Sequence, residues 1–152
     1  MTSLRTKLPT KLPLIARTLL GLVFFVFGLN GFLHFIPQPP MSGPPADFIG
    51  ALIGSGYLFT VLKATEVVAG ALLLTGRFVP LALALLAPVV VNIVLFHAFL
   101  APSGIAVPLV VLALEVFLAW SYRSAFRPML RAQVAPDVAP DPATHGAAAR
   151  LA

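Results

Sequence analysis

Four long apolar segments dominate this chain, and each of them carries polar side chains in its interior. The segments cover residues 12–36, 57–74, 78–100 and 105–122. Each is close to the ~20 residues that an α-helix needs to cross a ~30 Å hydrocarbon layer. Because backbone N–H and C=O groups in lipid must bond to one another, all four segments are predicted to be helices.

The connections between these segments predict how the helices are arranged. Residues 75–77 and 101–104 form turns so short that they can only reverse the chain. Consecutive helices are therefore predicted to be antiparallel neighbours. The Pro-rich stretch 37–45 predicts an extended chain without a helix. Asp47 is then expected to cap a short helix over 48–53, whose apolar residues suit the membrane interface. The predicted fold is therefore all-α: an integral membrane four-helix bundle, up-down-up-down, with a short interfacial helix before the second transmembrane helix.

The composition supports a membrane protein and excludes several kinds of chemistry. Of the 152 residues, 59% are hydrophobic and 10% are charged, and the mean hydropathy is +0.99. A soluble domain carries about 25% charged residues. The chain contains no cysteine, which excludes disulfides, thiolate metal ligands and a thiol relay.

The positive charge is placed where a membrane protein places it. The net charge is +5, but the basic residues gather at segment ends, which is the positive-inside pattern rather than a nucleic-acid footprint. The basic residues concerned are Arg5, Lys7, Lys11, Arg17, Arg77, Arg123, Arg127 and Arg131. Both termini are therefore predicted to be cytoplasmic. Residues 1–11 form a basic arm, residues 12–130 the transmembrane domain, and residues 131–152 an Ala/Pro-rich tail that is predicted to be disordered.

Arg17 and Glu115 are predicted to form a structural ion pair. Both fall about 6–11 Å inside the cytoplasmic end, on helices that are neighbours in an up-down bundle. The alternative is that Glu115 carries a proton in the membrane interior.

A candidate polar cavity lies in the outer half of the bilayer. Lys63 and Glu66 share one helical face and can neutralise each other. Asn30 and His34 share a face near the outer end of the first helix, and Asn92 lies at a similar depth on the third helix. A few convergent polar groups in apolar surroundings are typical of a small-molecule site. The alternative is that these residues only lower the cost of insertion and hold the bundle together.

His97 and Gly70 also have predicted places in the bundle. His97 lies five positions after Asn92, about 140° around the helix, so we expect Asn92 to face inward and His97 to lie at the interface. Gly70 is expected to allow close helix contact. Two histidines on different helices are a weak basis for haem, and no metal site is predicted.

The chain resembles the DoxX family of small bacterial membrane proteins over about residues 14–127. The resemblance rests on Arg17-x-x-Leu20-Gly21-x-x-Phe24-x-x-x-Gly28 in the first helix and Glu66-x-x-x-Gly70-x-x-Leu73-Leu74-x-Gly76-Arg77 in the second. It implies a four-helix bundle in the bacterial inner membrane. Some relatives are linked to membrane-associated oxidoreductase systems, including thiosulfate oxidation with quinone, and most have no established activity. The family often has a lysine near the outer end of the first helix, where this chain has Asn30-Gly31 and His34, so the role of that lysine is not transferred.

Three functions are compatible with these features. The first is a non-catalytic accessory or scaffold subunit that contacts the bilayer and a membrane or cytoplasmic protein, or further copies of itself. The second is a redox component that binds a quinone-like molecule in the outer cavity. The third is a transporter that acts as an oligomer. Hydrolytic motifs and phosphate loops are absent from the sequence, which favours the non-enzymatic alternative.

Overall fold

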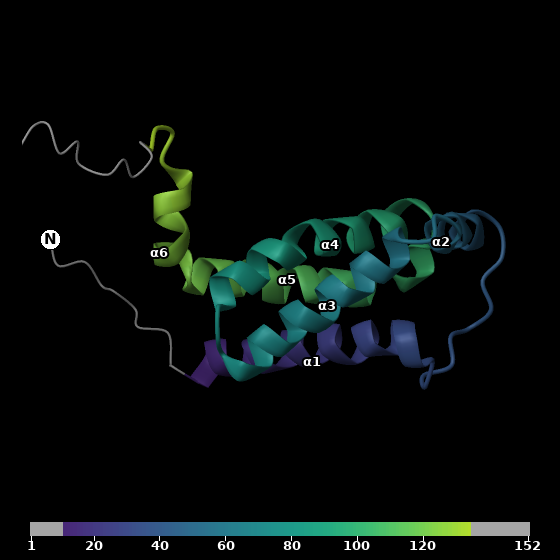
Figure 1. Cartoon of the computed structure of the whole chain (residues 1–152), viewed down its shortest axis with the longest axis horizontal. Helices are drawn as coiled ribbons and strands as arrows, with labels where there is room; N and C mark the ends of the chain where they lie inside the picture. Colours follow the sequence, from purple (N-terminus) through teal and green to yellow (C-terminus); the bar gives the residue numbers. More distant parts are fainter. Residues whose placement is uncertain (1–10, 135–152) are drawn as a thin grey trace, which may run out of the picture.

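The computed structural model describes residues 11–134, and in this part of the chain it is all-helical. The predicted basic arm, apart from Lys11, and the predicted tail beyond residue 134 lie outside the described residues. The elements are α1 (Lys11–Leu33), α2 (Pro44–Gly54), α3 (Leu58–Thr75), α4 (Val79–Phe99), η1 (Pro102–Gly104), α5 (Ala106–Ser121), α6 (Arg123–Phe126) and η2 (Arg127–Leu130). The predicted all-α membrane bundle is confirmed (Figure 1).

The four long helices form a closed ring in the order α1, α3, α4, α5. α1 packs most extensively on α3, α4 contacts both α3 and α5, and α5 returns to α1. The interior is filled by apolar side chains, of which the largest fully buried ones are Leu20, Leu73, Leu83, Leu86, Leu118 and Val90. These residues come from all four helices, so one core holds the ring together.

Among residues 11–134, three helices are long and apolar enough to cross a membrane, namely α1, α3 and α4. α5 has 16 residues, about 24 Å of helix, and is shorter than a hydrocarbon layer. The chain bends by 73° between α5 and the segment Arg123–Leu130. Taken together as one broken span, these two segments are also long and apolar enough to cross a membrane. In Figure 1, α6 turns sharply away from the bundle at this point.

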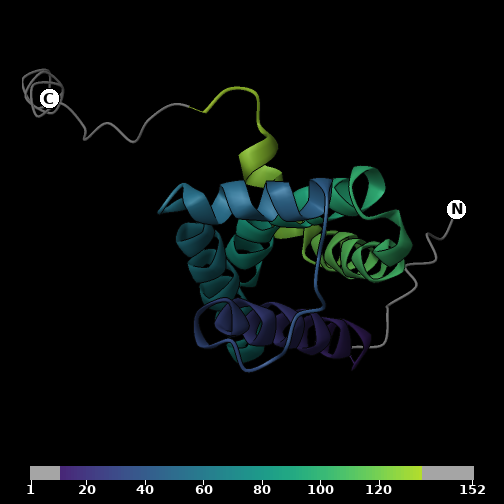
Figure 2. The ribbon, with the colours of Figure 1, turned by 90° about the vertical axis from the view of Figure 1, so that its right-hand side faces the viewer.

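The two ends of the bundle differ in character. At the basic end α1 begins, α3 ends before Arg77, and α5 ends before Arg123. At the opposite end, which we call the α2 end, α2 lies across the bundle axis (Figures 1 and 2). There the ring of Phe48 on α2 lies 5.7 Å from that of Phe96 on α4.

Two predicted boundaries were wrong, and both have a local cause. α1 ends at Leu33 rather than at residue 36, and the backbone turns left-handed at His34, with φ 53°. α2 begins at Pro44 rather than at 48, because proline is tolerated in the first helical turn, where its missing N–H is not needed. The N-cap is therefore Gly43, not Asp47, which lies in the first turn.

Candidate functional site

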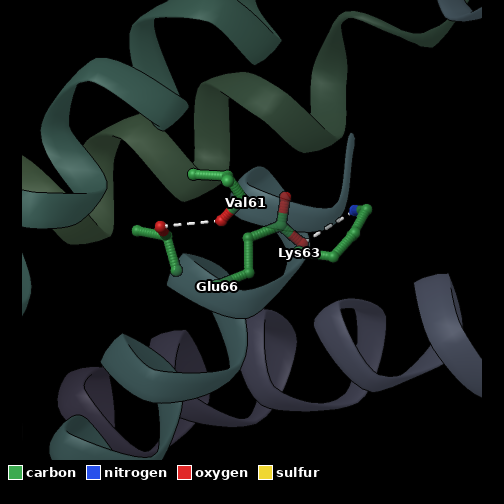
Figure 3. A network of polar contacts seen from close by, with 4 residues as sticks. Val61, Lys63 and Glu66 are labelled. Atoms are coloured by element: carbon green, nitrogen blue, oxygen red, sulfur yellow. Dashed lines mark hydrogen bonds and ion pairs between the residues drawn. The ribbon is translucent and has the colours of Figure 1, made fainter. Parts of the chain in front are cut away.

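Lys63 and Glu66 form the ion pair that the sequence predicts. Lys63 Nζ donates to Glu66 Oε2 over 2.8 Å, and both residues lie on the same side of α3 (Figure 3). The Glu66 side chain is only 4% exposed, whereas that of Lys63 is 19% exposed. Lys63 also lies near the ring of Phe59, with Nζ 5.8 Å from its centroid. The buried carboxylate therefore depends on the lysine, which keeps some access to its surroundings.

Glycines on α1 bring this pair against the neighbouring helix. A Cβ atom added to Gly28 would lie 2.9 Å from the backbone N of Val67 and 3.0 Å from Cβ of Glu66. One added to Gly31 would collide with the aliphatic stem of Lys63. The ion pair thus lies directly against Gly28 and Gly31 of α1, and this close contact leaves little room for a third molecule.

The close contact between α1 and α3 continues toward the basic end of the bundle at Gly70 and Gly21. A Cβ atom on Gly70 would lie 2.5 Å from the backbone N of Phe25. A Cβ atom on Gly21 would lie 3.2 Å from the carbonyl oxygen of Gly70. The predicted close helix contact at Gly70 is confirmed, and small residues on both helices let the two backbones approach.

Asn30 binds the chain that leaves α1. Ile36 N–H donates to Asn30 Oδ1 over 2.6 Å, and Asn30 Nδ2 donates to the Ile36 carbonyl over 3.2 Å. Asn30 is 6% exposed. The amide therefore satisfies two backbone groups beyond the end of the helix and fixes the direction in which the chain leaves α1. Fewer of its donor and acceptor positions remain for a ligand.

The other two predicted cavity residues point elsewhere. His34 is exposed on the loop after α1, and Asn92 is exposed on α4, where Nδ2 donates to the Pro88 carbonyl over 2.9 Å. The expectation that Asn92 faces inward was wrong. His97 is half-buried, with Nδ1 2.8 Å from the Ile93 carbonyl, and its ring packs over Gly104.

The five predicted cavity residues therefore do not share one set of contacts. Lys63 and Glu66 pair with each other, Asn30 is bound to a loop backbone, and His34 and Asn92 lie on the surface. Within residues 11–134, no three His, Asp or Glu side chains gather as metal ligands.

Arg17 and Glu115 are not joined. The ion pair that residues 11–134 contain is Lys63–Glu66. Arg17 Nε and Glu115 Oε2 are both enclosed, and neither has a hydrogen-bond partner among the described residues. The Arg17 guanidinium instead lies over Gly76, where any added Cβ would collide with it.

The sequence did not predict a groove between α4 and α5. It has a volume of about 290 Å³, and Glu115 is the ionisable residue in its lining. Three alanines contribute to its walls, namely Ala84, Ala87 and Ala119. The available signal was the position of Ala119 one turn after Glu115, opposite small residues of an antiparallel helix.

Comparison with known proteins identifies a family for most of the bundle. The family model described as DoxX matches residues 12–98, which include α1 to nearly all of α4. No curated protein and no solved structure matches the chain.

Proposed function

The chain belongs to the DoxX family, and from that premise we propose that it is a small accessory or scaffold subunit of a membrane-associated protein system. The observation that carries this proposal is that four of the five residues predicted to surround a ligand, namely Lys63, Glu66, Asn30 and Asn92, are bonded within the chain. Lys63 binds Glu66, Asn30 binds the backbone of Ile36, and Asn92 binds the carbonyl of its own helix. Polar groups that are bonded in this way are not free to act on a substrate.

The outer surface supports the same proposal. Large apolar side chains are exposed on every long helix, among them Leu19 on α1, Val61 on α3, Leu85 on α4 and Val110 on α5. Such a surface contacts lipid or the helices of other membrane proteins. A redox or transport role is less well supported, because the polar residues predicted to surround a ligand do not converge.

We further propose that the protein lies in the bacterial plasma membrane with the basic end toward the cytoplasm. Arg77 and the arginines after α5 lie at that end. The connection between α1 and α3 carries a single charged residue, Asp47, and the connection between α4 and α5 carries none. This distribution follows the positive-inside rule.

Photo-crosslinking in native membranes tests the scaffold proposal. A photoreactive residue is placed in the full chain at Leu19, Val61, Leu85 or Val110, one on each long helix. We expect a discrete protein adduct from one or two of these faces, and only lipid adducts from the others. Mass spectrometry identifies the adduct, and the level of the identified protein should fall in membranes that lack this chain.

Two results would overturn the proposal. One is the absence of a protein adduct at all four positions. The other is an identified partner whose level and activity are unchanged when the chain is deleted. Asn92→Leu serves as a control for a substitution on the surface of the bundle, since Asn92 is exposed and its amide is bonded to its own helix.

A further inference from the structure

The groove between α4 and α5 is an apolar channel along the outer seam of the bundle. Its floor contains the buried residues Leu83, Val90 and Glu115. Its rim contains Val91 and Val116, which are 49% and 58% exposed. The groove therefore opens sideways, onto the surface that faces acyl chains when the bundle lies in a bilayer. Its volume of about 290 Å³ is near the lower limit for small-molecule sites, ~300 Å³.

The Glu115 carboxyl group is the polar feature of this groove. The residue is 6% exposed, and Oε2 accepts no hydrogen bond from residues 11–134. The other residues that line the groove are all apolar. A buried carboxylate without a partner is costly. The groove is therefore complementary to a molecule that supplies both an apolar body and a hydrogen-bond donor.

Arg17 and Arg123 contact other parts of the chain and do not line the groove. Arg17 on α1 lies over Gly76 and is not paired with Glu115. At the basic end Phe126 closes the lining, and Arg123 lies over the ring of Trp120 at 5.1 Å. The lateral opening of the groove is bordered by the apolar side chains of Val91 and Val116, so an aliphatic chain enters from the side that faces lipid.

We propose that the α4–α5 groove binds a lipophilic cation, an aliphatic chain that ends in a protonated nitrogen, with an N–H group donating to the Glu115 carboxylate. The aliphatic chain lies along the alanines and valines of the groove and is held by the hydrophobic effect. The charge-assisted hydrogen bond stabilises the Glu115 carboxylate inside the groove, where the carboxylate is shielded from water. A fatty acid, which brings a second negative charge, is rejected. This inference needs no protein partner and is independent of the scaffold proposal.

Binding is measured on the full chain in phosphatidylcholine nanodiscs, with a bromine-substituted dodecylamine as the probe. Trp120 is the single tryptophan of the chain and directly follows the groove residue Ala119, so the bromine quenches its fluorescence on binding. We expect saturable quenching that is displaced by unlabelled dodecylamine and not by dodecanoate. Because a hydrogen bond to a charged group is worth ~1.5–3 kcal/mol, Glu115→Gln should weaken binding by about tenfold or more.

A second variant keeps the test valid if Glu115→Gln does not fold. Ala87→Leu retains the carboxyl group and fills the groove from an exposed position, and it should also weaken binding. Asn92→Leu, which lies outside this groove, should bind the amine as the unaltered protein does.

Equal quenching in the unaltered protein, Glu115→Gln and Ala87→Leu would overturn the site, because such a result would show only partition of the amine into lipid. Equally tight binding of dodecanol would overturn the requirement for a cation, and equally tight binding of dodecyltrimethylammonium the requirement for an N–H donor.

Discussion

The guanidinium group of Arg17 lies over the backbone of Gly76, in the space that any side chain at position 76 would occupy. Gly76 has φ 71° and ends α3 in a Schellman motif, in which Gly76 N–H donates to the Leu73 carbonyl and Arg77 N–H to that of Leu72. A cation at this place also opposes the negative end of the α3 dipole. The contact joins the first half of α1 to the α3–α4 turn.

Gly76→Ala should destabilise the protein more than Gly56→Ala does. Both glycines have a positive φ, 71° and 79°, so both variants carry the cost of a left-handed alanine, about 1–3 kcal/mol. Only at position 76 does the new Cβ meet another group, since Gly56 has nothing within 4 Å of it among the described residues. The additional loss is about 1–3 kcal/mol, as for other overpacked sites. Denaturant unfolding of the purified protein in detergent measures both variants.

A double variant separates collision from strain. In the Arg17→Ala background the difference between Gly76→Ala and Gly56→Ala should shrink, because the colliding group is gone. A difference that persists unchanged would show that Arg17 does not occupy this space.

Asn30→Leu should lower the stability and the membrane level of the protein, whereas Asn92→Leu should not. The first change leaves the part-buried N–H and C=O groups of Ile36 without their partner, at a cost of up to about 1–3 kcal/mol for each group. The second removes an exposed amide that is bonded to its own helix. Quantitative blotting of membranes and thermal unfolding in detergent compare the two. Similar losses in both variants would mean that Asn30 has no special role at the end of α1.

Lys63→Met should cost more than Glu66→Gln. Losing the lysine strands a carboxylate whose side chain is 4% exposed, whereas losing the carboxylate leaves an ammonium group that is 19% exposed and flexible enough to reach a polar region. Breaking a buried pair by removing one partner typically costs about 3–5 kcal/mol. The double variant Lys63→Met/Glu66→Gln should therefore lose less than the sum of the single losses, in the same unfolding assay. Strict additivity would contradict the observed pair.

The sequence predicted the helices well because lipid allows the backbone few alternatives. An apolar run of about twenty residues must satisfy its own N–H and C=O groups, so the segments and their antiparallel order follow from the run lengths and the short turns. The Lys63–Glu66 pair was predictable for a similar reason, since both residues lie one turn apart on one helix.

The directions of the polar side chains were harder to predict. Apolar residues cover every side of α4, so no polar stripe indicated which side faces the core, and Asn92 was assigned to the wrong one. Asn30 is bonded to Ile36, whose position depends on where α1 ends. The Arg17–Glu115 prediction used the depth of the two residues and the adjacency of their helices, and neither shows that the arginine side chain lies over Gly76 instead.

Single cysteines provide a test of the proposed orientation, because the chain contains no cysteine of its own. Ser42 and Ser103 are exposed at the α2 end, and Ser124 is exposed at the basic end. If the basic end faces the cytoplasm, a membrane-impermeant maleimide added to intact spheroplasts should label Ser42→Cys and Ser103→Cys. Ser124→Cys should react only after the membrane is permeabilised, because the reagent cannot reach it from outside.

Reporter fusions check the same topology independently. Fusions after Arg77 and after Arg131 should be active as cytoplasmic reporters, and an insertion in residues 37–45 should be active as an external one. The physical reason is that arginine-rich connections are retained on the cytoplasmic side during insertion, whereas the connections at the α2 end carry a single charged residue, Asp47. Labelling of Ser124→Cys in intact spheroplasts, together with a cytoplasmic signal from residues 37–45, would reverse the assignment. It would also place the bend between α5 and α6 on the outer side of the membrane.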